Sequence, residues 1–226
     1  MTGSSPPMPA GVIFDCDGTL ADTETLSARA WRDVLARRGI EVTDADHAAI
    51  IGHAWPRGFD HFSARADLGD QEVFRSELRA HAVAIYDEHL RLFPDAADTL
   101  RALSGAGVPV AVASSSSRAH VLRCLERGHL GDHVTAVIGA DDVRDHKPHP
   151  EPYLAAAAAL GVPATRCTAI EDTPIGLTSA RAAGAFTVAV ERGVVDPAGL
   201  TVADRVVRTL DVSVLVPPRD WVSPAA

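Results

Sequence analysis

An apolar run that ends in two carboxylates is the feature that most constrains the fold of this chain. Residues 11–14 (GVIF) have the composition of a buried strand, and Asp15 and Asp17 follow directly after it. Charged side chains at the exit of a core strand are unfavourable unless another group pairs with them, so this stretch predicts a functional site. The alternative is a solvated turn of the Asp-x-Asp-Gly type, and the rest of the chain has to distinguish the two.

The spacing of the two aspartates allows two geometries. In an extended chain Asp15 and Asp17 point to the same face, because side chains alternate along a strand. If the chain curls at Gly18 instead, one carboxylate and the next backbone carbonyl can face a bound cation. Hard oxygen ligands of this kind suit Mg²⁺.

The composition is that of a globular protein without a nucleic-acid or membrane surface. Of the 226 residues, 46% are hydrophobic and 23% are charged, which allows a sizeable core. The net charge is −9 and there is no dense basic run, which argues against nucleic acid or an anionic membrane as a partner. No apolar stretch approaches the roughly 18 residues that cross a bilayer.

Two further features indicate a cytoplasmic location. Residues 1–9 lack the basic head and the apolar core of a secretory signal, so we expect a short disordered lead there. Cys16, Cys124 and Cys167 are odd in number and widely spaced, and they resemble neither a disulfide framework nor a zinc motif.

Helical periodicity dominates the stretch after the opening motif. Apolar residues recur on one face over 26–35, Asp22 or Thr23 can cap this helix, and Gly39 can end it. As far as about residue 92 the pattern stays helical and rich in polar residues. The best helical pieces in that part are 47–52, 71–78 and 81–92.

After residue 93, short apolar runs alternate with helices. The predicted strands are 108–113, 134–138, 168–170 and 186–190, and the predicted helices are 96–103, 118–127, 151–160 and 175–183. This alternation predicts a parallel α/β sheet with right-handed crossovers, and the continuous apolar strands predict helices on both faces. The opening strand belongs to this sheet by composition, so residues 25–92 are predicted to form a helical insertion.

Polar side chains follow each predicted strand. Serines 114–117 follow the second strand, Lys147 comes after the third, and Glu171 and Asp172 come after the fourth. Each group alone has an ordinary explanation: a capping loop, a solvated lysine, or a helix N-terminus that favours negative charge. Because ligands of parallel sheets bind where the strands end, acids, hydroxyls and a lysine on one edge predict a phosphoryl-transfer site with a divalent cation.

Together these motifs resemble those of the haloacid dehalogenase-like hydrolases. Residues 15–20 (DCDGTL) are similar to the first motif of that family, and Ser114 fits the small hydroxyl that ends the second strand. Lys147-Pro148 fits the lysine motif, and residues 171–176 (EDTPIG) fit the acidic fourth motif. The four motifs occur in order, and the resemblance extends from about residue 10 to residue 207.

The resemblance implies an architecture. It predicts a Rossmann-like catalytic core of residues 10–24 and 93–216, into which an all-helical cap of residues 25–92 is inserted. This helical cap is shared with phosphoglycolate phosphatase-like and beta-phosphoglucomutase-like members of the family.

The resemblance also implies how the reaction is divided among the residues. Asp15 would attack phosphorus to form an aspartyl-phosphate, and Asp17 would protonate the leaving alcohol and later activate water. Ser114 and Lys147 would hold the phosphoryl oxygens.

The same resemblance implies a magnesium site. Mg²⁺ would lie between the Asp15 carboxylate, the Asp17 backbone carbonyl and Asp172, with Glu171 close by. A carboxylate approaches a phosphate dianion only when cations cancel the repulsion, which agrees with this arrangement.

Departures from the family patterns favour hydrolysis of a small phosphate monoester, such as a sugar phosphate. A carbon–halogen hydrolase of this family typically lacks the second aspartate. The mutase members carry a cap histidine after the first motif and a Lys-Asn pair after the second strand, whereas this chain has no histidine over 22–27 and has Ser117-Arg118. A beta-phosphoglucomutase-type mutase is the alternative within the family, and a catalytically silent regulatory protein is the alternative outside catalysis.

Five residues are candidates for binding the substrate. In the cap, residues 52–57 are expected to form a loop that faces the substrate. Trp55 could stack on a sugar and Arg57 could pair with a second anion, although Trp55 could equally pack the cap core. In the core, Ser115, Ser116 and Arg118 follow the second strand. Arg118 either faces the pocket or caps the next helix.

Overall fold

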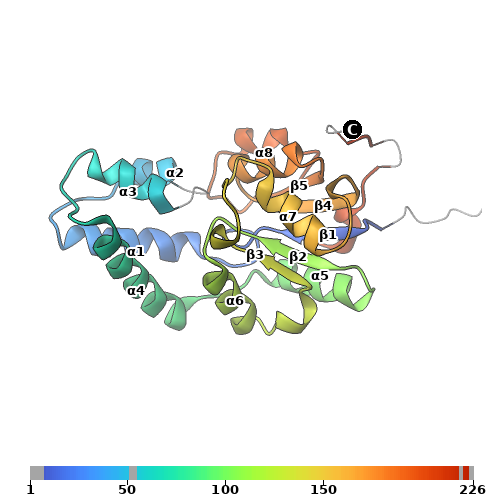
Figure 1. Ribbon diagram of the computed structural model, residues 1–226, viewed down its shortest axis with the longest axis horizontal. Coiled ribbons are helices and arrows are strands. Elements are labelled where there is room, and N and C mark those ends of the chain that lie inside the picture. The colour runs from blue at the N-terminus through green and yellow to red at the C-terminus, as the bar shows by residue number, and fades with distance from the viewer. Residues whose placement is uncertain (1–7, 51–54, 219–220, 224–226) are drawn as a thin grey trace, which may run out of the picture.

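A six-stranded parallel sheet lies at the centre of the molecule. The computed structural model describes residues 8–50, 55–218 and 221–223, and its sheet has the order β3-β2-β1-β4-β5-β6 (Figure 1). The strands are β1 Gly11–Phe14, β2 Val110–Ala113, β3 Ala136–Ile138, β4 Cys167–Glu171, β5 Phe186–Val190 and β6 Arg205–Val207. The predicted parallel α/β sheet is confirmed, and β6 is a strand that the sequence analysis did not predict.

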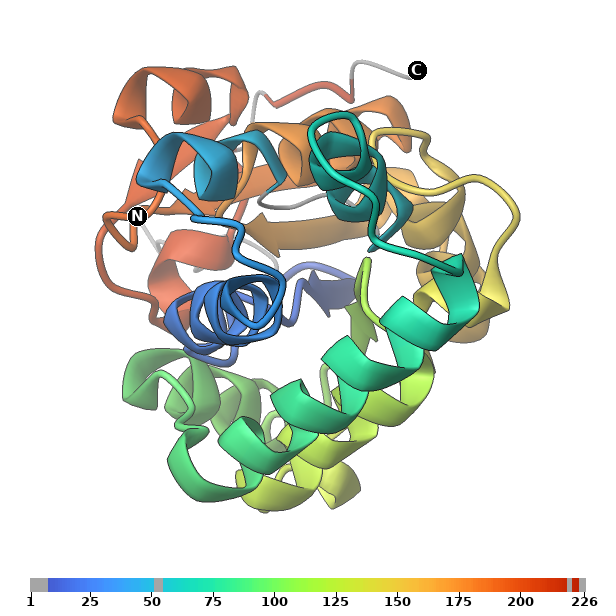
Figure 2. The same cartoon turned by 90° about the vertical axis from the view of Figure 1, so that its left-hand side faces the viewer.

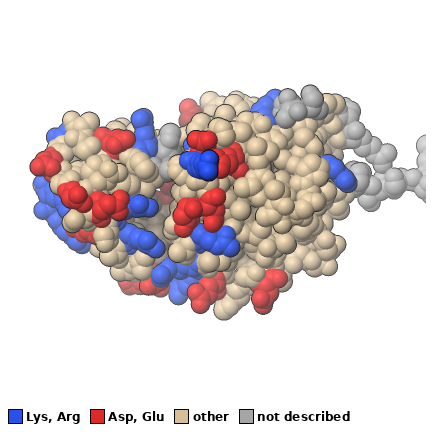
Figure 3. Space-filling view, viewed as in Figure 1, with Lys and Arg blue, Asp and Glu red and all other residues tan. Residues whose placement is uncertain are grey.

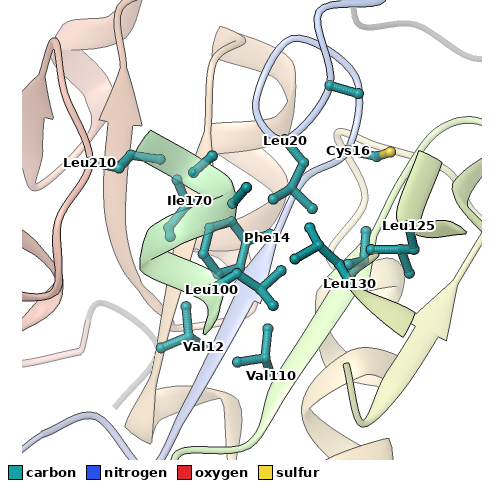
Figure 4. Packing of buried hydrophobic residues seen from close by; sticks show 14 of the residues in the cluster. Val12, Phe14, Cys16, Leu20, Leu100, Val110, Leu125, Leu130, Ile170 and Leu210 are labelled. Atoms are coloured by element: carbon teal, nitrogen blue, oxygen red, sulfur yellow. The ribbon is translucent and has the colours of Figure 1, made fainter. Parts of the chain in front are cut away.

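Helices cover both faces of this sheet, as the apolar strands predicted. Val12 and Phe14 of β1 pack with Leu100 of helix α5 (Pro94–Gly105) and with Leu125 of helix α6 (Arg118–Arg127), as Figure 4 shows. Ile13 points to the opposite face, where helices α7 (Glu151–Ala159) and α8 (Pro174–Ala182) lie. The sheet is therefore the middle layer of three.

Of the five helices between β1 and β2 in the described residues, the first four pack together around a separate hydrophobic cluster, and we call them the helical segment. They are α1 Glu24–Ala36, α2 Asp44–Ile50, α3 Trp55–Ser63 and α4 Gln71–His89, and Figure 2 shows them in front of the sheet. Trp31 of α1 is central, with its ring centroid 5.3 Å from Phe62 and 5.8 Å from Phe74. These helices bury their apolar faces against one another, so the helical segment has its own core.

The helical segment differs in two places from the sequence prediction. The two predicted pieces 71–78 and 81–92 are one continuous helix, α4, because no glycine or proline interrupts them and Asp70 caps the start by accepting from the Glu72 and Val73 amides. The predicted loop 52–57 is partly helical, since α3 begins at Trp55 with Pro56 in its first turn. Residues 51–54 lie outside the described part of the chain. They include the end of the predicted helical piece 47–52 and the first half of this loop.

The surface in Figure 3 carries mixed charges. Acidic and basic side chains alternate over the helical segment and its border with the sheet, so this face has no basic patch of the kind that binds nucleic acid. None of the helices in the described residues has the length and hydrophobicity that crossing a membrane requires.

Candidate active site

The register of β1 and β4 brings the first acidic groups together. Phe14 pairs with Ile170, and the Asp15 amide donates to the Ile170 carbonyl at 2.9 Å. Asp15 therefore leaves the sheet beside Glu171, the last residue of β4. Parallel pairing thus places residues that are 156 positions apart at one edge.

Lys147 joins these two carboxylates. Its ammonium donates to Asp15 Oδ1 and to Glu171 Oε1, each at 2.6 Å, and all three side chains are at least nine-tenths buried. It is the only lysine in the chain. Such a buried charge is stable only when it is paired and hydrogen-bonded, so the lysine and the two acids depend on one another.

Burial and neighbouring charges shift the pKa values of Lys147 and Asp15. Burial by itself lowers the pKa of Lys147, but the charges of Asp15 and Glu171 raise it well above the usual value. Burial raises the pKa of Asp15, and Glu171 and Asp172 raise it further although Lys147 opposes them. One ammonium therefore does not neutralise the surrounding carboxylates, and the edge has a deficit of positive charge.

Glu171 is fixed by donors on all sides. Its Oε2 accepts from the amides of Asp172 and Thr173 at 3.1 Å and from the Thr173 hydroxyl at 3.0 Å, while Tyr153 donates to Oε1 at 3.0 Å. Gly176 makes room for it, because a Cβ there would lie 1.6 Å from Oε1. Glu171 is thus a preorganised acceptor whose two oxygens are already occupied.

The acidic cluster of Asp15, Glu171 and Asp172 fits a divalent cation. Asp15, Glu171 and Asp172 each offer a carboxylate oxygen within 4.8 Å of the others. Asp172 Oδ1 accepts from the Thr19 hydroxyl at 3.0 Å, but its Oδ2 is buried without a hydrogen-bond partner among the described residues. Burial and the charge of Glu171 raise the pKa of Asp172. An unpartnered buried oxygen in an acidic cluster is what a hard cation such as Mg²⁺ would satisfy.

Asp17 has a different environment from Asp15. Its Oδ1 accepts from the Thr23 hydroxyl at 2.7 Å and from His120 Nε2 at 2.8 Å, and its Oδ2 accepts from the Ser114 hydroxyl at 3.1 Å. Although burial raises the pKa of Asp17, His120 and these hydrogen bonds lower it overall. Burial lowers the pKa of His120, but Asp17 outweighs it and raises that pKa to about 11. The two form an ion pair beside the site.

A cavity of about 560 Å³ lies between this edge and the helical segment. Asp15, Asp17, Lys147 and Glu171 line one side, together with the serines that follow β2. The helical segment contributes Glu24, Trp55, Arg75, Arg79 and Tyr86. The indole of Trp55 also stacks on Phe59 at 5.4 Å between ring centroids, so Trp55 both borders the cavity and packs on its own core.

The three serines predicted to belong to the site, Ser114, Ser115 and Ser116, have different surroundings. The Ser114 oxygen accepts from the Ser116 amide at 2.9 Å and its hydroxyl donates to Asp17, so Ser114 is turned toward the acid. Ser115 and Ser116 line the cavity, and their predicted role in binding the substrate stays a prediction.

The structure does not place two predicted substrate-binding arginines at the cavity. The Arg118 guanidinium turns to the end of β3, where it donates to the Val137 carbonyl and, at 3.3 Å, to Asp142. Arg57 lies on the exposed side of α3, because Gly58 is the residue that packs against Trp31. Arg75, Arg79 and Arg123 are the arginines that line the cavity in the described residues.

Among the cavity residues that the sequence analysis missed, two titratable groups lie beside Asp17. His120 lies in the first turn of α6. The sequence could have indicated this residue, because the helix begins at the edge of the sheet where the strands end. Glu24 is the first residue of α1, and burial together with the charges of Asp17 and Asp15 raises its pKa to about 8. A histidine and a buried acid beside the predicted site are candidates for proton chemistry.

The chain resembles proteins of known family and structure. Residues 9–184 match the family model of the haloacid dehalogenase-like hydrolases. The chain is 34% identical to the fructose-1-phosphate phosphatase YqaB of Escherichia coli over 80% of this chain and 96% of that protein. It is 30% identical to hexitol phosphatase B of Escherichia coli, over 83% of this chain and 86% of that protein. The structure of CbbY from Rhodobacter sphaeroides in complex with xylulose-1,5-bisphosphate superposes with a TM-score of 0.80 and 26% identity, covering 89% of this chain and 95% of that chain.

The glycine at the turn of the first motif gives a test of the cation site. Gly18 has φ +79°, and a Cβ there would lie 2.1 Å from Asp172 Oδ2, whereas Gly39 has φ +71° and nothing within 4 Å of its Cβ position. Replacing either by alanine should lower the free energy of unfolding by about 1–2 kcal/mol through left-handed backbone strain. Only Gly18→Ala should also weaken Mg²⁺ binding, measured by isothermal titration calorimetry. Equal Mg²⁺ affinities for Gly18→Ala and Gly39→Ala would contradict this assignment.

Proposed function

The chain belongs to the haloacid dehalogenase-like hydrolases and is a phosphoric monoester hydrolase, and from this premise we propose that it is a magnesium-dependent phosphatase of small sugar phosphates. The observation that carries the proposal is the buried Lys147 bridge between Asp15 and Glu171 at the end of the sheet. A lysine beside a cavity-facing carboxylate is suited to holding a phosphoryl group against a nucleophile of the same charge.

Asp15 is the nucleophile of the proposed reaction. Its carboxylate attacks phosphorus, the bond from phosphorus to the ester oxygen breaks, and the phosphoryl group is transferred to Asp15. Water then attacks phosphorus, and phosphate leaves as the Asp15 carboxylate is regenerated. Two displacements replace one difficult displacement. Lys147 and the serines after β2 orient the phosphoryl oxygens, and Lys147 offsets part of the repulsion between substrate and nucleophile.

Mg²⁺ belongs to the same proposal. The Asp15 and Asp172 carboxylates and the Asp17 carbonyl would hold it, and Glu171 would position the neighbouring backbone. When bound, it would supply the positive charge that the acidic edge lacks.

Asp17 and His120 transfer the proton that the leaving alcohol needs in the proposed reaction. In the ion pair, His120 Nε2 holds a proton against Asp17 Oδ1 at 2.8 Å. Passing that proton to Asp17 makes its carboxyl group an acid, which protonates the departing alcohol. When water attacks, Asp17 takes a proton from it and the pair returns to its starting state. His120 therefore supplies Asp17 with the proton that a poor leaving group requires.

The helical segment is the proposed cap. It closes one side of the cavity with Glu24 and Tyr86 near the reacting groups and with Arg75 and Arg79 farther along α4. Hydroxyl groups of a sugar match the carboxyl and phenol, while the arginines suit anionic or hydroxyl-rich ends. The names of the relatives, a fructose-1-phosphate phosphatase and a hexitol phosphatase, support the same substrate class.

Asp15→Asn tests the proposed nucleophile. Phosphate release from a panel of sugar phosphates should require Mg²⁺ and should fall by at least about a thousandfold in this variant, since the attacking carboxylate is lost. Asp22→Asn is the matched control, because Asp22 is exposed and outside the cavity lining. A wild type as inactive as Asp15→Asn would indicate a silent protein, and an isomerised sugar phosphate without free phosphate would indicate a mutase.

His120→Gln tests the proton supply. With alkyl esters such as sugar phosphates, kcat/KM should fall by about 10²–10⁴-fold, the range of general acid–base catalysis. With p-nitrophenyl phosphate, whose leaving group departs without a proton, the loss should be far smaller. His89→Gln, at a partly exposed histidine at the end of α4 that does not line the cavity, should change neither. A loss of equal size for both substrates would contradict the proposal, because a purely structural role would not distinguish leaving groups.

A further inference from the structure

Two thiols and an imidazole lie together beside Asp17. Cys16 stands between Asp15 and Asp17 in the chain but points into the core beside α6, as Figure 4 shows. Cys124 lies one helical turn after His120 on α6, and both cysteines are free and fully buried. One sulfur from each cysteine and one ring nitrogen of His120 all lie within 4.8 Å of one another.

We propose that Cys16, Cys124 and His120 form a binding site for one soft divalent cation, such as Zn²⁺ or Cd²⁺, and that occupation of this site inhibits the enzyme. The inhibition rests on the proposed phosphatase function, whereas the binding does not. These residues form no recognisable zinc motif in the sequence, because Cys16 follows β1 and the other two ligands lie on a helix more than a hundred residues later.

The distances suit tetrahedral coordination. Cys124 Sγ lies 3.6 Å from His120 Nε2. A tetrahedral zinc ion, with bonds of about 2.3 Å to sulfur and about 2.0 Å to nitrogen, places these two atoms about 3.5 Å apart. Asp17 Oδ1 lies 2.8 Å from the same nitrogen and can supply a fourth, oxygen ligand after a small shift. Cys124 and His120 therefore already have the separation of two ligands on one zinc ion, and Cys16 offers its sulfur within 4.8 Å of both.

The two thiols and the imidazole disfavour Mg²⁺, the cation of the proposed reaction. Thiolates and imidazole prefer Zn²⁺ and related soft ions, whereas Mg²⁺ prefers the oxygens of Asp15 and Asp172. On binding, each thiol and His120 Nε2 lose a proton to solvent.

The route to the site and the consequence of binding follow from its position. His120 and Asp17 line the cavity, so a cation can reach the thiols from the substrate side. Once bound, it occupies the nitrogen that otherwise donates to Asp17 and holds the Asp17 carboxylate in place. The proton that the leaving group needs is then no longer available.

Titration with Cd²⁺ tests the binding. The reduced protein, saturated with Mg²⁺, should develop thiolate-to-cadmium charge-transfer absorption in the ultraviolet that saturates at one equivalent. Cys124→Ala should lose this absorption or need at least about tenfold more Cd²⁺, since even partners of metal ligands change affinity by about 10–100-fold. Cys124→Ser, which conserves the volume, is a second variant in case alanine prevents folding. Cys167→Ala is the matched control, because Cys167 is buried at the start of β4, at the opposite end of that strand from the site.

The outcomes separate binding from regulation. We expect Zn²⁺ to inhibit phosphate release by the wild type and by Cys167→Ala at the same concentrations, and a chelator selective for zinc over magnesium to restore activity. Cys124→Ala should keep its magnesium-dependent activity and resist Zn²⁺. Absence of the absorption in the wild type, or its persistence in both Cys124 variants, would overturn the site. Stoichiometric binding without inhibition would overturn the regulatory role and leave the phosphatase proposal untouched.

Discussion

The arrangement of the site depends on one buried ammonium group between two carboxylates. Lys147 is the only lysine of the chain, and its side chain is 2% exposed while it donates to Asp15 and Glu171. A buried charge is stable only when it is paired and hydrogen-bonded, so the lysine and the two acids depend on one another. Tyr153 and the amides after β4 fix Glu171, and the register of β1 and β4 fixes Asp15. Much of the local structure therefore serves to hold three charges in place.

A second consequence is the division between the two aspartates of the first motif. Asp15 faces the lysine and the acidic cluster, where negative charge is in excess, whereas Asp17 is paired with His120 and accepts from two hydroxyls. The positive φ of Gly18 and the space that it leaves for Asp172 allow the chain to turn between these surroundings. Cys16 lies between them and faces the core, so one short turn joins an oxygen-rich site to a sulfur-rich one.

The sequence was sufficient where a side chain follows directly from a strand. Asp15, Ser114, Glu171 and Asp172 could be placed at one edge because buried strands are continuous apolar runs and parallel strands end together. Helix orientation could not be predicted in the same way. His120 reaches Asp17 because of how α6 packs on the sheet, and Arg57 and Arg118 turn away because neighbouring contacts, Gly58 on Trp31 and the acidic turn after β3, direct them.

The Asp17→Asn variant with p-nitrophenyl phosphate as substrate separates attack by Asp15 from the hydrolysis step that needs Asp17. This leaving group departs without a proton, so the first displacement can proceed while the second lacks its base. In the presence of Mg²⁺, we expect a burst of one equivalent of nitrophenol and a phosphoryl group on the peptide that contains Asp15, detected by mass spectrometry after acid quench. Turnover without a burst and without a phosphorylated Asp15 peptide would contradict it.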